Sequence, residues 1–182
     1  MKKTKLLWII AFASIICLSC SVKTVEQTTT TIVEERTSTT SPPFQIFFVR
    51  HAEKSKNDPR DPDLNEDGQA RAQQLKYHLA EAGITKIYST EYKRTQQTVE
   101  PLAEALGLEV EIYATDLASI TEDLKFSTSG NILVVGHSNT TPKLISKLLG
   151  EESYEKLDES VYNKLFVLIK SDDQFTATTL QY

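Results

Sequence analysis

Two apolar segments, each followed directly by a charged or imidazole side chain, constrain this chain more than any other feature. Residues 46–49 read Ile-Phe-Phe-Val and lead into Arg50 and His51, and residues 131–136 form a second apolar run before His137. Runs rich in aromatic and β-branched residues are typical of buried strands. Because ligands bind at the carboxyl ends of strands in open α/β sheets, neighbouring strands of this kind would place both imidazoles in one pocket.

The rest of the chain from residue 44 onward alternates helical and extended patterns. Asn65 is expected to cap the first helix, and glycines at positions 83, 107 and 150 are expected to end helices. The patterns predict helices at residues 66–82, 91–105, 116–126 and 140–149, and strands at residues 46–49, 86–89, 109–113, 131–136, 165–170 and 176–182. This alternation predicts one α/β domain over residues 44–182, a three-layer α/β/α arrangement with a mainly parallel central sheet.

The first 43 residues differ from the rest. Lysines at positions 2, 3 and 5 precede an apolar stretch at residues 6–16, which predicts a signal peptide over residues 1–19. Leu18-Ser19-Cys20 resembles a bacterial lipobox, so Cys20 is the expected lipidated residue, although Cys17 stands where an aliphatic residue is usual. Ordinary signal-peptide cleavage and a retained anchor stay as alternatives. Residues 20–43, rich in threonine and serine, are expected to be a flexible linker.

The net charge and the positions of the cysteines exclude some classes of function. The formal net charge is -5, and it becomes -8 when the three leader lysines are removed, which argues against a nucleic-acid partner. Both cysteines lie in the leader, so residues 44–182 can form no disulfide and offer no thiolate metal ligand. We therefore expect an exported domain of the cell envelope, held to the membrane by its lipid anchor alone.

Four short motifs occur in one order along the domain: residues 50–53 (Arg-His-Ala-Glu), residues 64–72 with an Asn-Glu-Asp-Gly core, residues 89–98 around Arg94, and residues 136–138 (Gly-His-Ser). Together they resemble the histidine phosphatase superfamily, the phosphoglycerate mutase-like family, from residue 46 to about residue 150. The resemblance implies a phosphoglycerate mutase-like fold and phosphoryl chemistry without a metal or cofactor.

The resemblance also implies roles for the matching residues. His51 would be the nucleophile that carries a covalent phosphohistidine, Arg50 and Arg94 would bind the phosphoryl oxygens, and His137 would donate a hydrogen bond in the transition state. A neutral imidazole is a competent nucleophile, and fixed cationic donors are what a phosphoryl group in transit needs.

Other assignments stay open at this point. Asn57 is a candidate phosphate contact or an ordinary loop residue, and Ser138 is a candidate substrate contact beside the strand-to-helix turn. Asp116 is a candidate general acid for the leaving group, but it suits a helix N-cap equally well, and Glu122 and Asp123 are alternatives. Glu53 is expected to orient its neighbours rather than to act as an acid.

The distance between the motifs bears on the reaction. Only residues 108–130 lie between the Arg94 helix and the His137 strand, which leaves little material for a lid, and an open site favours hydrolysis. We expect a phosphomonoester hydrolase that acts on a phosphorylated small molecule or a phosphoprotein. A phosphomutase, a metal-dependent hydrolase and a non-catalytic phosphate-binding module are the alternatives.

Overall fold

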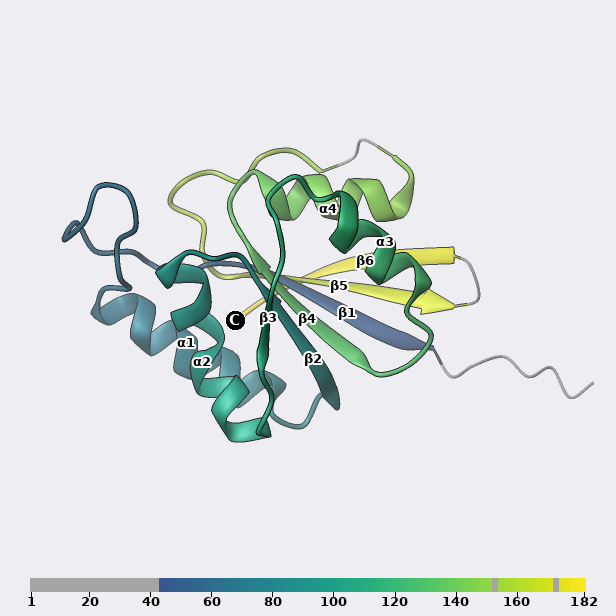
Figure 1. Ribbon diagram of the computed structural model, residues 1–182, viewed down its shortest axis with the longest axis horizontal. Coiled ribbons are helices and arrows are strands. Elements are labelled where there is room, and N and C mark those ends of the chain that lie inside the picture. The colour runs from purple at the N-terminus through teal and green to yellow at the C-terminus, as the bar shows by residue number, and fades with distance from the viewer. Residues whose placement is uncertain (1–42, 152–153, 172–173) are drawn as a thin grey trace, which may run out of the picture. The chain divides into compact units, whose positions relative to one another are not determined.

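The computed structural model describes residues 43–151, 154–171 and 174–182. The predicted signal peptide, Cys20, the linker up to residue 42, and residues 152–153 and 172–173 lie outside the described residues. The elements are, in chain order, β1 (Phe44–Arg50), α1 (Glu66–Leu79), β2 (Ile84–Ser89), α2 (Lys93–Leu106), β3 (Val110–Ile112), α3 (Ala118–Phe126), β4 (Asn131–Gly136), α4 (Thr140–Leu149), β5 (Lys164–Ser171) and β6 (Gln174–Gln181) (Figure 1). Among the described helices, none is long and apolar enough to cross a bilayer.

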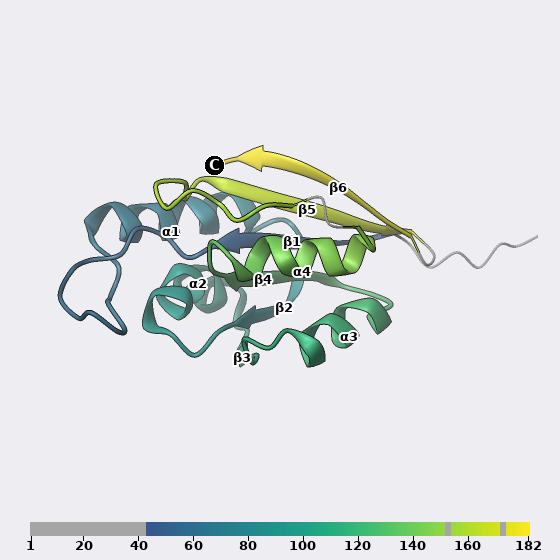
Figure 2. The same ribbon diagram turned by 90° about the horizontal axis from the view of Figure 1, so that it is seen from above.

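The strands form one sheet in the order β3-β2-β4-β1-β5-β6, with β3 and β6 at its opposite edges (Figure 2). The pairs β1 with β4, β2 with β4 and β2 with β3 are parallel, while β5 runs antiparallel to both β1 and β6. The predicted mainly parallel sheet is confirmed, and so is the prediction that the two histidine-bearing strands are neighbours. Arg50 lies opposite Gly136 in that pair.

The helices cover the sheet on two sides, α1 and α2 on one and α3 and α4 on the other (Figure 1). Side chains alternate between the faces of a strand, so β1 contributes to both cores. Phe47 and Val49 pack in the α1 and α2 layer, while Ile46 and Phe48 pack in the α3 and α4 layer. Every one of these four side chains is at most 5% exposed, which makes β1 the centre of the fold.

Several predicted boundaries shift by a few residues. Asn65 caps α1 as expected, because its Oδ1 accepts a hydrogen bond from the Gly68 amide at 2.8 Å. The helix ends at Leu79 instead of residue 82, and Gly83, with φ of 64°, turns the chain into β2. At α3 the start moves to Ala118, since Leu117 adopts φ of 66°, a conformation that side chains other than glycine seldom take.

Candidate active site

The two imidazoles meet at the carboxyl ends of β1 and β4. The His51 amide donates to the Gly136 carbonyl at 2.9 Å, which continues the ladder between the strands by one residue. The ring centroids of His51 and His137 lie 5.5 Å apart with their planes at 65°. Gly136 allows this packing, because a Cβ there would lie 2.7 Å from Thr141 Oγ1 and 2.9 Å from the Tyr113 hydroxyl.

His51 is held in one tautomer. Its Nδ1 lies 2.8 Å from the Ala52 carbonyl oxygen, which can only accept, so Nδ1 carries the proton and Nε2 keeps its lone pair. The side chain is 4% exposed. Its pKa is lowered to about 3, chiefly by burial; the Ala52 bond opposes this lowering, and the charges of Arg50 and Arg94 add to it. His51 is therefore a neutral base at pH 7.

His137 is held in the other tautomer. Its Nδ1 lies 3.5 Å from Arg94 Nη2, which can only donate, so the proton is on Nε2, 3.0 Å from Thr90 Oγ1. Thr90 then donates to Thr95 Oγ1 at 2.9 Å, and Thr95 donates to the Tyr92 carbonyl at 2.7 Å. Burial, and then the charge of Arg94, lower the pKa of His137 to about 4.

Arg94 faces the histidines with free donors. It lies in the first turn of α2, its side chain is 14% exposed, and its guanidinium stacks 4.3 Å from the Tyr92 ring centroid. Within the described residues, its buried Nε and Nη1 have no hydrogen-bond partner, although Nη1 lies 3.7 Å from an Asp61 carboxylate oxygen. Buried donors of a charged group are normally paired, so these nitrogens are available to an anion.

Arg50 is arranged differently. The side chain is 2% exposed, and its Nη1 donates to the carbonyls of Asp158, Glu159 and Val161 at 3.0–3.1 Å. Its Nη2 donates to the Glu159 carboxylate at 2.7 Å, and Tyr162 covers the guanidinium at 4.2 Å. Among the described residues only its Nε lacks a partner. The guanidinium fork expected for the phosphoryl group is thus occupied by the chain itself.

The segment at residues 157–162 is part of the site that the sequence did not reveal. The Glu159 carboxylate accepts hydrogen bonds from Arg50 and from Ser138 Oγ at 3.0 Å, and lies 3.1 Å from Lys156 Nζ. Bonds from Lys156 and Ser138 lower the pKa of Glu159 to about 2. The segment follows Gly150 without helical or strand periodicity, so no local pattern marks it.

The other predicted residues differ in their surroundings. Glu53 receives Nε and Nη2 of Arg71 from α1, and a Cβ on Gly68 would lie 2.1 Å from the Glu53 carbonyl oxygen. Glu53 thus ties α1 to the end of β1, as expected of an orienting residue. Asn57 is exposed and bonds within its own loop, to Ser55 and Asp63, and no hydrogen bond in the described part of the chain joins it to the histidines.

Asp116 lies beside the histidine site. A cavity of about 580 Å³ is lined by Asp116 together with Arg94 and His137. The prediction that Asp116 caps α3 is wrong, because the N-cap position falls on Leu117; Asp116 precedes it, and its Oδ1 accepts from the Ala118 amide at 3.1 Å. Its alternatives Glu122 and Asp123 lie exposed on α3 and do not line this cavity.

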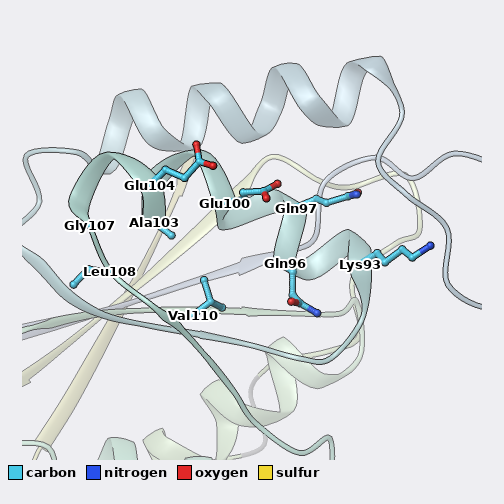
Figure 3. A pocket seen from close by; sticks show the side chains of 9 residues that line it. All are labelled: Lys93, Gln96, Gln97, Glu100, Ala103, Glu104, Gly107, Leu108 and Val110. Carbon is cyan, nitrogen blue, oxygen red and sulfur yellow. The ribbon is translucent and has the colours of Figure 1, made fainter.

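A separate hollow of about 450 Å³ runs along α2 and the residues after it (Figure 3). Its polar lining comes from Lys93, Gln96, Gln97, Glu100 and Glu104, and neither histidine of the site borders it. Across residues 43–151, 154–171 and 174–182, no group of three or more His, Cys, Asp and Glu side chains is placed to hold a metal ion.

Part of the chain is similar in sequence to known proteins. Residues 46–118 match the family model of the histidine phosphatase superfamily (branch 1). A curated relative, the "Probable phosphoglycerate mutase GpmB" of Shigella dysenteriae, is 36% identical over 73 aligned residues, and the match covers 37% of this chain and 34% of that protein. The chain thus spans about a third of the length of the curated relatives it matches.

Solved structures share the fold over a larger part of the chain. The protein histidine phosphatase SixA complexed with tungstate superposes with a TM-score of 0.63 and 16% identity, covering 76% of this chain and 97% of that chain. Phosphoserine phosphatase from Entamoeba histolytica in complex with 3-phosphoglyceric acid gives a TM-score of 0.62 and 15% identity, covering 76% and 97%. At these identities the likeness concerns the fold.

Proposed function

Since residues 46–118 belong to the histidine phosphatase superfamily, we propose that this chain hydrolyses phosphomonoesters through a phosphohistidine on His51. The observation that carries the proposal is the pair of neutral imidazoles 5.5 Å apart, next to an arginine with unpartnered buried nitrogens. The names of the structural neighbours, a protein histidine phosphatase and a phosphoserine phosphatase, support the same reaction class.

In the first step, His51 Nε2 attacks phosphorus. A nitrogen–phosphorus bond forms as the bond from phosphorus to the ester oxygen breaks, and the ester oxygen leaves with the electron pair. The imidazole becomes positively charged, and the Ala52 carbonyl that accepts from Nδ1 stabilises this charge. Arg94 donates to the equatorial oxygens through the nitrogens that have no partner in the described structure.

His137 would change its protonation when substrate binds. Its Nδ1 is an acceptor in the free protein because Arg94 donates toward it. A bound phosphoryl dianion raises the pKa of an adjacent imidazole, since opposite charges favour the charged form. Once protonated on both nitrogens, His137 donates from Nδ1 to the phosphoryl group while Nε2 stays on Thr90.

Arg50 would contribute less directly. Of its nitrogens, only Nε is free of a partner in the described structure, so a phosphoryl oxygen meets Nη2 only after the Glu159 carboxylate moves away, while Nη1 stays on the backbone carbonyls. The leaving oxygen needs a proton unless it belongs to a good leaving group. Asp116 is the candidate donor because it lines the cavity next to His137.

The second step is transfer to water. Water attacks the phosphorus of the phosphohistidine as the nitrogen–phosphorus bond breaks and its electron pair returns to Nε2. Inorganic phosphate leaves with the protons of the water, and neutral His51 is restored. Retransfer to a bound intermediate, the phosphomutase alternative, requires that water be excluded. Between β3 and β4 the chain has only α3 and its connections, and no insertion covers the histidines there. This architecture favours hydrolysis, although the curated relative is named as a mutase.

Release of p-nitrophenol from p-nitrophenyl phosphate in EDTA tests the proposal. We expect turnover to survive chelation, and expect His51→Ala to lower it by at least about 1,000-fold, the order found for nucleophile removal. His78→Ala is the matched control, since His78 is the third histidine of the chain and lies exposed on α1. A labelled phosphoryl group trapped on the wild type and absent from His51→Ala would identify the intermediate.

Other outcomes favour the alternatives. Loss of turnover in EDTA and its recovery with a divalent cation would favour a metal-dependent hydrolase. Phosphate binding without turnover would favour a binding module, and transfer to an added phosphoglycerate rather than to water would favour a mutase.

We also propose that Cys20 carries a lipid that holds the domain at the membrane. The support is the leader sequence alone, a basic start followed by an apolar stretch and Leu18-Ser19-Cys20. In a bacterial host, Cys20→Ser is expected to move the protein from the membrane fraction to the soluble fraction, with Cys17→Ser as the matched control. Unchanged membrane association of Cys20→Ser would contradict the proposal.

A further inference from the structure

The cavity beside His137 extends beyond the groups that the reaction itself needs. It measures about 580 Å³ and is bordered by the start of α4, the turn before α3 and the start of α2. Arg94 and His137 line it, and so do Lys143 and Lys147 of α4. A phosphoryl group on His51 would thus have its ester substituent next to a large opening.

The charges of this lining are unbalanced. Arg94, Lys143 and Lys147 are basic, and Asp116 is the single acidic residue of the lining, whereas the whole chain has a net charge of -5. Both lysines are exposed, and no ion pair within the described residues engages either of them. A local excess of positive charge on an acidic protein, next to a reactive site, attracts anions.

The two lysines share one face of α4. They are four residues apart, a spacing at which like charges are neighbours and weaken a helix. The cavity also reaches the beginning of this helix at Thr140, where the helix dipole adds positive potential. An anion between the lysines would remove the repulsion and use the field of the helix end.

The remaining walls suit a polar organic group. Tyr92 packs edge-on against His137 with centroids 5.1 Å apart and forms a flat side. Thr115, Asn139 and Thr140 bring hydroxyl and amide groups to the lining. With a rise of about 1.5 Å per residue, Lys143 and Lys147 lie roughly 4.5 Å and 10 Å along the axis from Thr140, which sets the length of a fitting substituent.

From these observations we propose that the cavity binds a second anionic group of the substrate, carried on its leaving group and held by Lys143 and Lys147. The preferred substrates would be phosphomonoesters whose alcohol part bears a carboxylate or another phosphate, at a distance of roughly 4.5 to 10 Å from the scissile bond. The inference rests on the proposed function for the position of the phosphoryl group at His51. It makes the electrostatics of α4 the basis of substrate choice.

Two phosphonates of equal shape test the proposal by binding alone. The first, 4-(carboxymethyl)benzylphosphonate, carries a second anion, and its amide, 4-(carbamoylmethyl)benzylphosphonate, does not. By isothermal titration calorimetry at low salt, we expect the acid to bind the wild type roughly five- to tenfold more tightly, the range of one or two exposed ion pairs. Added salt should reduce this ratio, because exposed charges are screened.

The variants show whether the lysines cause the preference. Lys143→Gln and Lys147→Gln should each lower the ratio, and the double variant should bring it near one without changing the affinity for the amide. Lys76→Gln, which removes a charge from α1 on the other side of the sheet, should leave the ratio unchanged. Circular dichroism of each variant checks the fold.

The possible results separate the two proposals. Equal affinity for the acid and the amide, no binding of either, or a preference that survives the double variant would overturn the second anion site, even if p-nitrophenyl phosphate is hydrolysed. A preference that depends on the lysines would support the site, even if no ester is turned over, and the hydrolase would then be the proposal that fails.

Discussion

Two arginines flank the paired imidazoles, and their surroundings are opposite. At the end of β1, Arg50 gives both Nη atoms to residues 158–161 and lies under Tyr162. At the start of α2, Arg94 keeps two buried nitrogens without partners in the described structure. A sequence motif thus supplies an arginine, while the rest of the fold decides whether the charge of that arginine is free for a ligand or used to hold the chain together.

Of the changes at the two arginines and their partners, Arg94→Ala should have the largest effect. Removing a donor from developing phosphoryl charge typically costs 100- to 1,000-fold in rate, so we expect kcat/KM for p-nitrophenyl phosphate to fall by about that factor. The free energy of unfolding should change by less than about 1 kcal/mol, since no strong hydrogen bond of Arg94 is lost. Steady-state kinetics and urea titration measure both quantities. A stability loss as large as the rate loss would assign Arg94 a structural role.

Arg50→Ala should lower the free energy of unfolding more than Arg94→Ala does. It removes the donor of three carbonyls and leaves a gap under Tyr162, so the free energy of unfolding should fall by roughly 3 kcal/mol. Arg50→Lys keeps the charge without the fork and should recover only part of this loss. Urea titration at pH 7 gives the values. If Arg50→Ala is as stable as wild type, the contacts to residues 158–161 contribute little to folding.

Acid should weaken the fold through the histidines that these arginines face. In the unfolded chain an imidazole has a pKa near 6.5, but in the fold the pKa values of His51 and His137 are lowered to about 3 and 4. At a pH between the folded pKa of each histidine and 6.5, the unfolded state therefore binds more protons than the folded state. Stability is therefore present above pH 6.5 and lost as the pH falls. At pH 5 the loss should reach about 2 kcal/mol for His51, and less for the more exposed His137.

Urea titrations at pH 7 and pH 5 measure this loss. His51→Asn should remove the His51 part of this loss. A free energy of unfolding that is the same at both pH values would show that the imidazoles titrate normally in the fold.

Glu159→Gln should give the smallest effect, and it tests whether the Glu159 carboxylate keeps Arg50 from binding a ligand. The neutral amide holds Arg50 Nη2 less strongly, so Arg50 becomes more like Arg94, and the Kd for inorganic phosphate should fall about three- to fivefold. Glu155→Gln is the matched control, an exposed carboxylate of the same connection. Calorimetric titration with phosphate distinguishes them. Weaker phosphate binding by Glu159→Gln would mean that Glu159 positions Arg50 for the ligand instead of competing for it.

Local sequence patterns were sufficient to predict the fold class. The apolar runs of β1 and β4, the Asn65 cap and the glycines after α2 and α4 are short-range signals, and the structure has each of them where it was expected. Boundaries differed where backbone conformation overrides composition, as at Leu117, whose positive φ no pattern announces. The buried position of Leu117, 3% exposed, holds it in place.

The candidate site was predicted in part. The meeting of His51 and His137 follows from strand adjacency, and Arg94 follows from its place at the start of a helix after a strand. The occupied state of Arg50 could not be predicted, because its partners lie about 110 residues away in a segment without periodicity. Thr90 and Tyr92 lie inside a quoted motif, yet only the three-dimensional contacts with His137 show what they do.

The hydrogen bond from the His51 amide to the Gly136 carbonyl has a consequence for how such a domain can diversify. It makes His51, the proposed nucleophile, an extension of the sheet, with the stiffness of a strand and not of a loop. Surface connections around it can therefore lengthen, shorten or exchange side chains while the imidazole keeps its place. If His51 acts as proposed, new substrate preferences can arise by changing its surroundings, without rebuilding the end of β1.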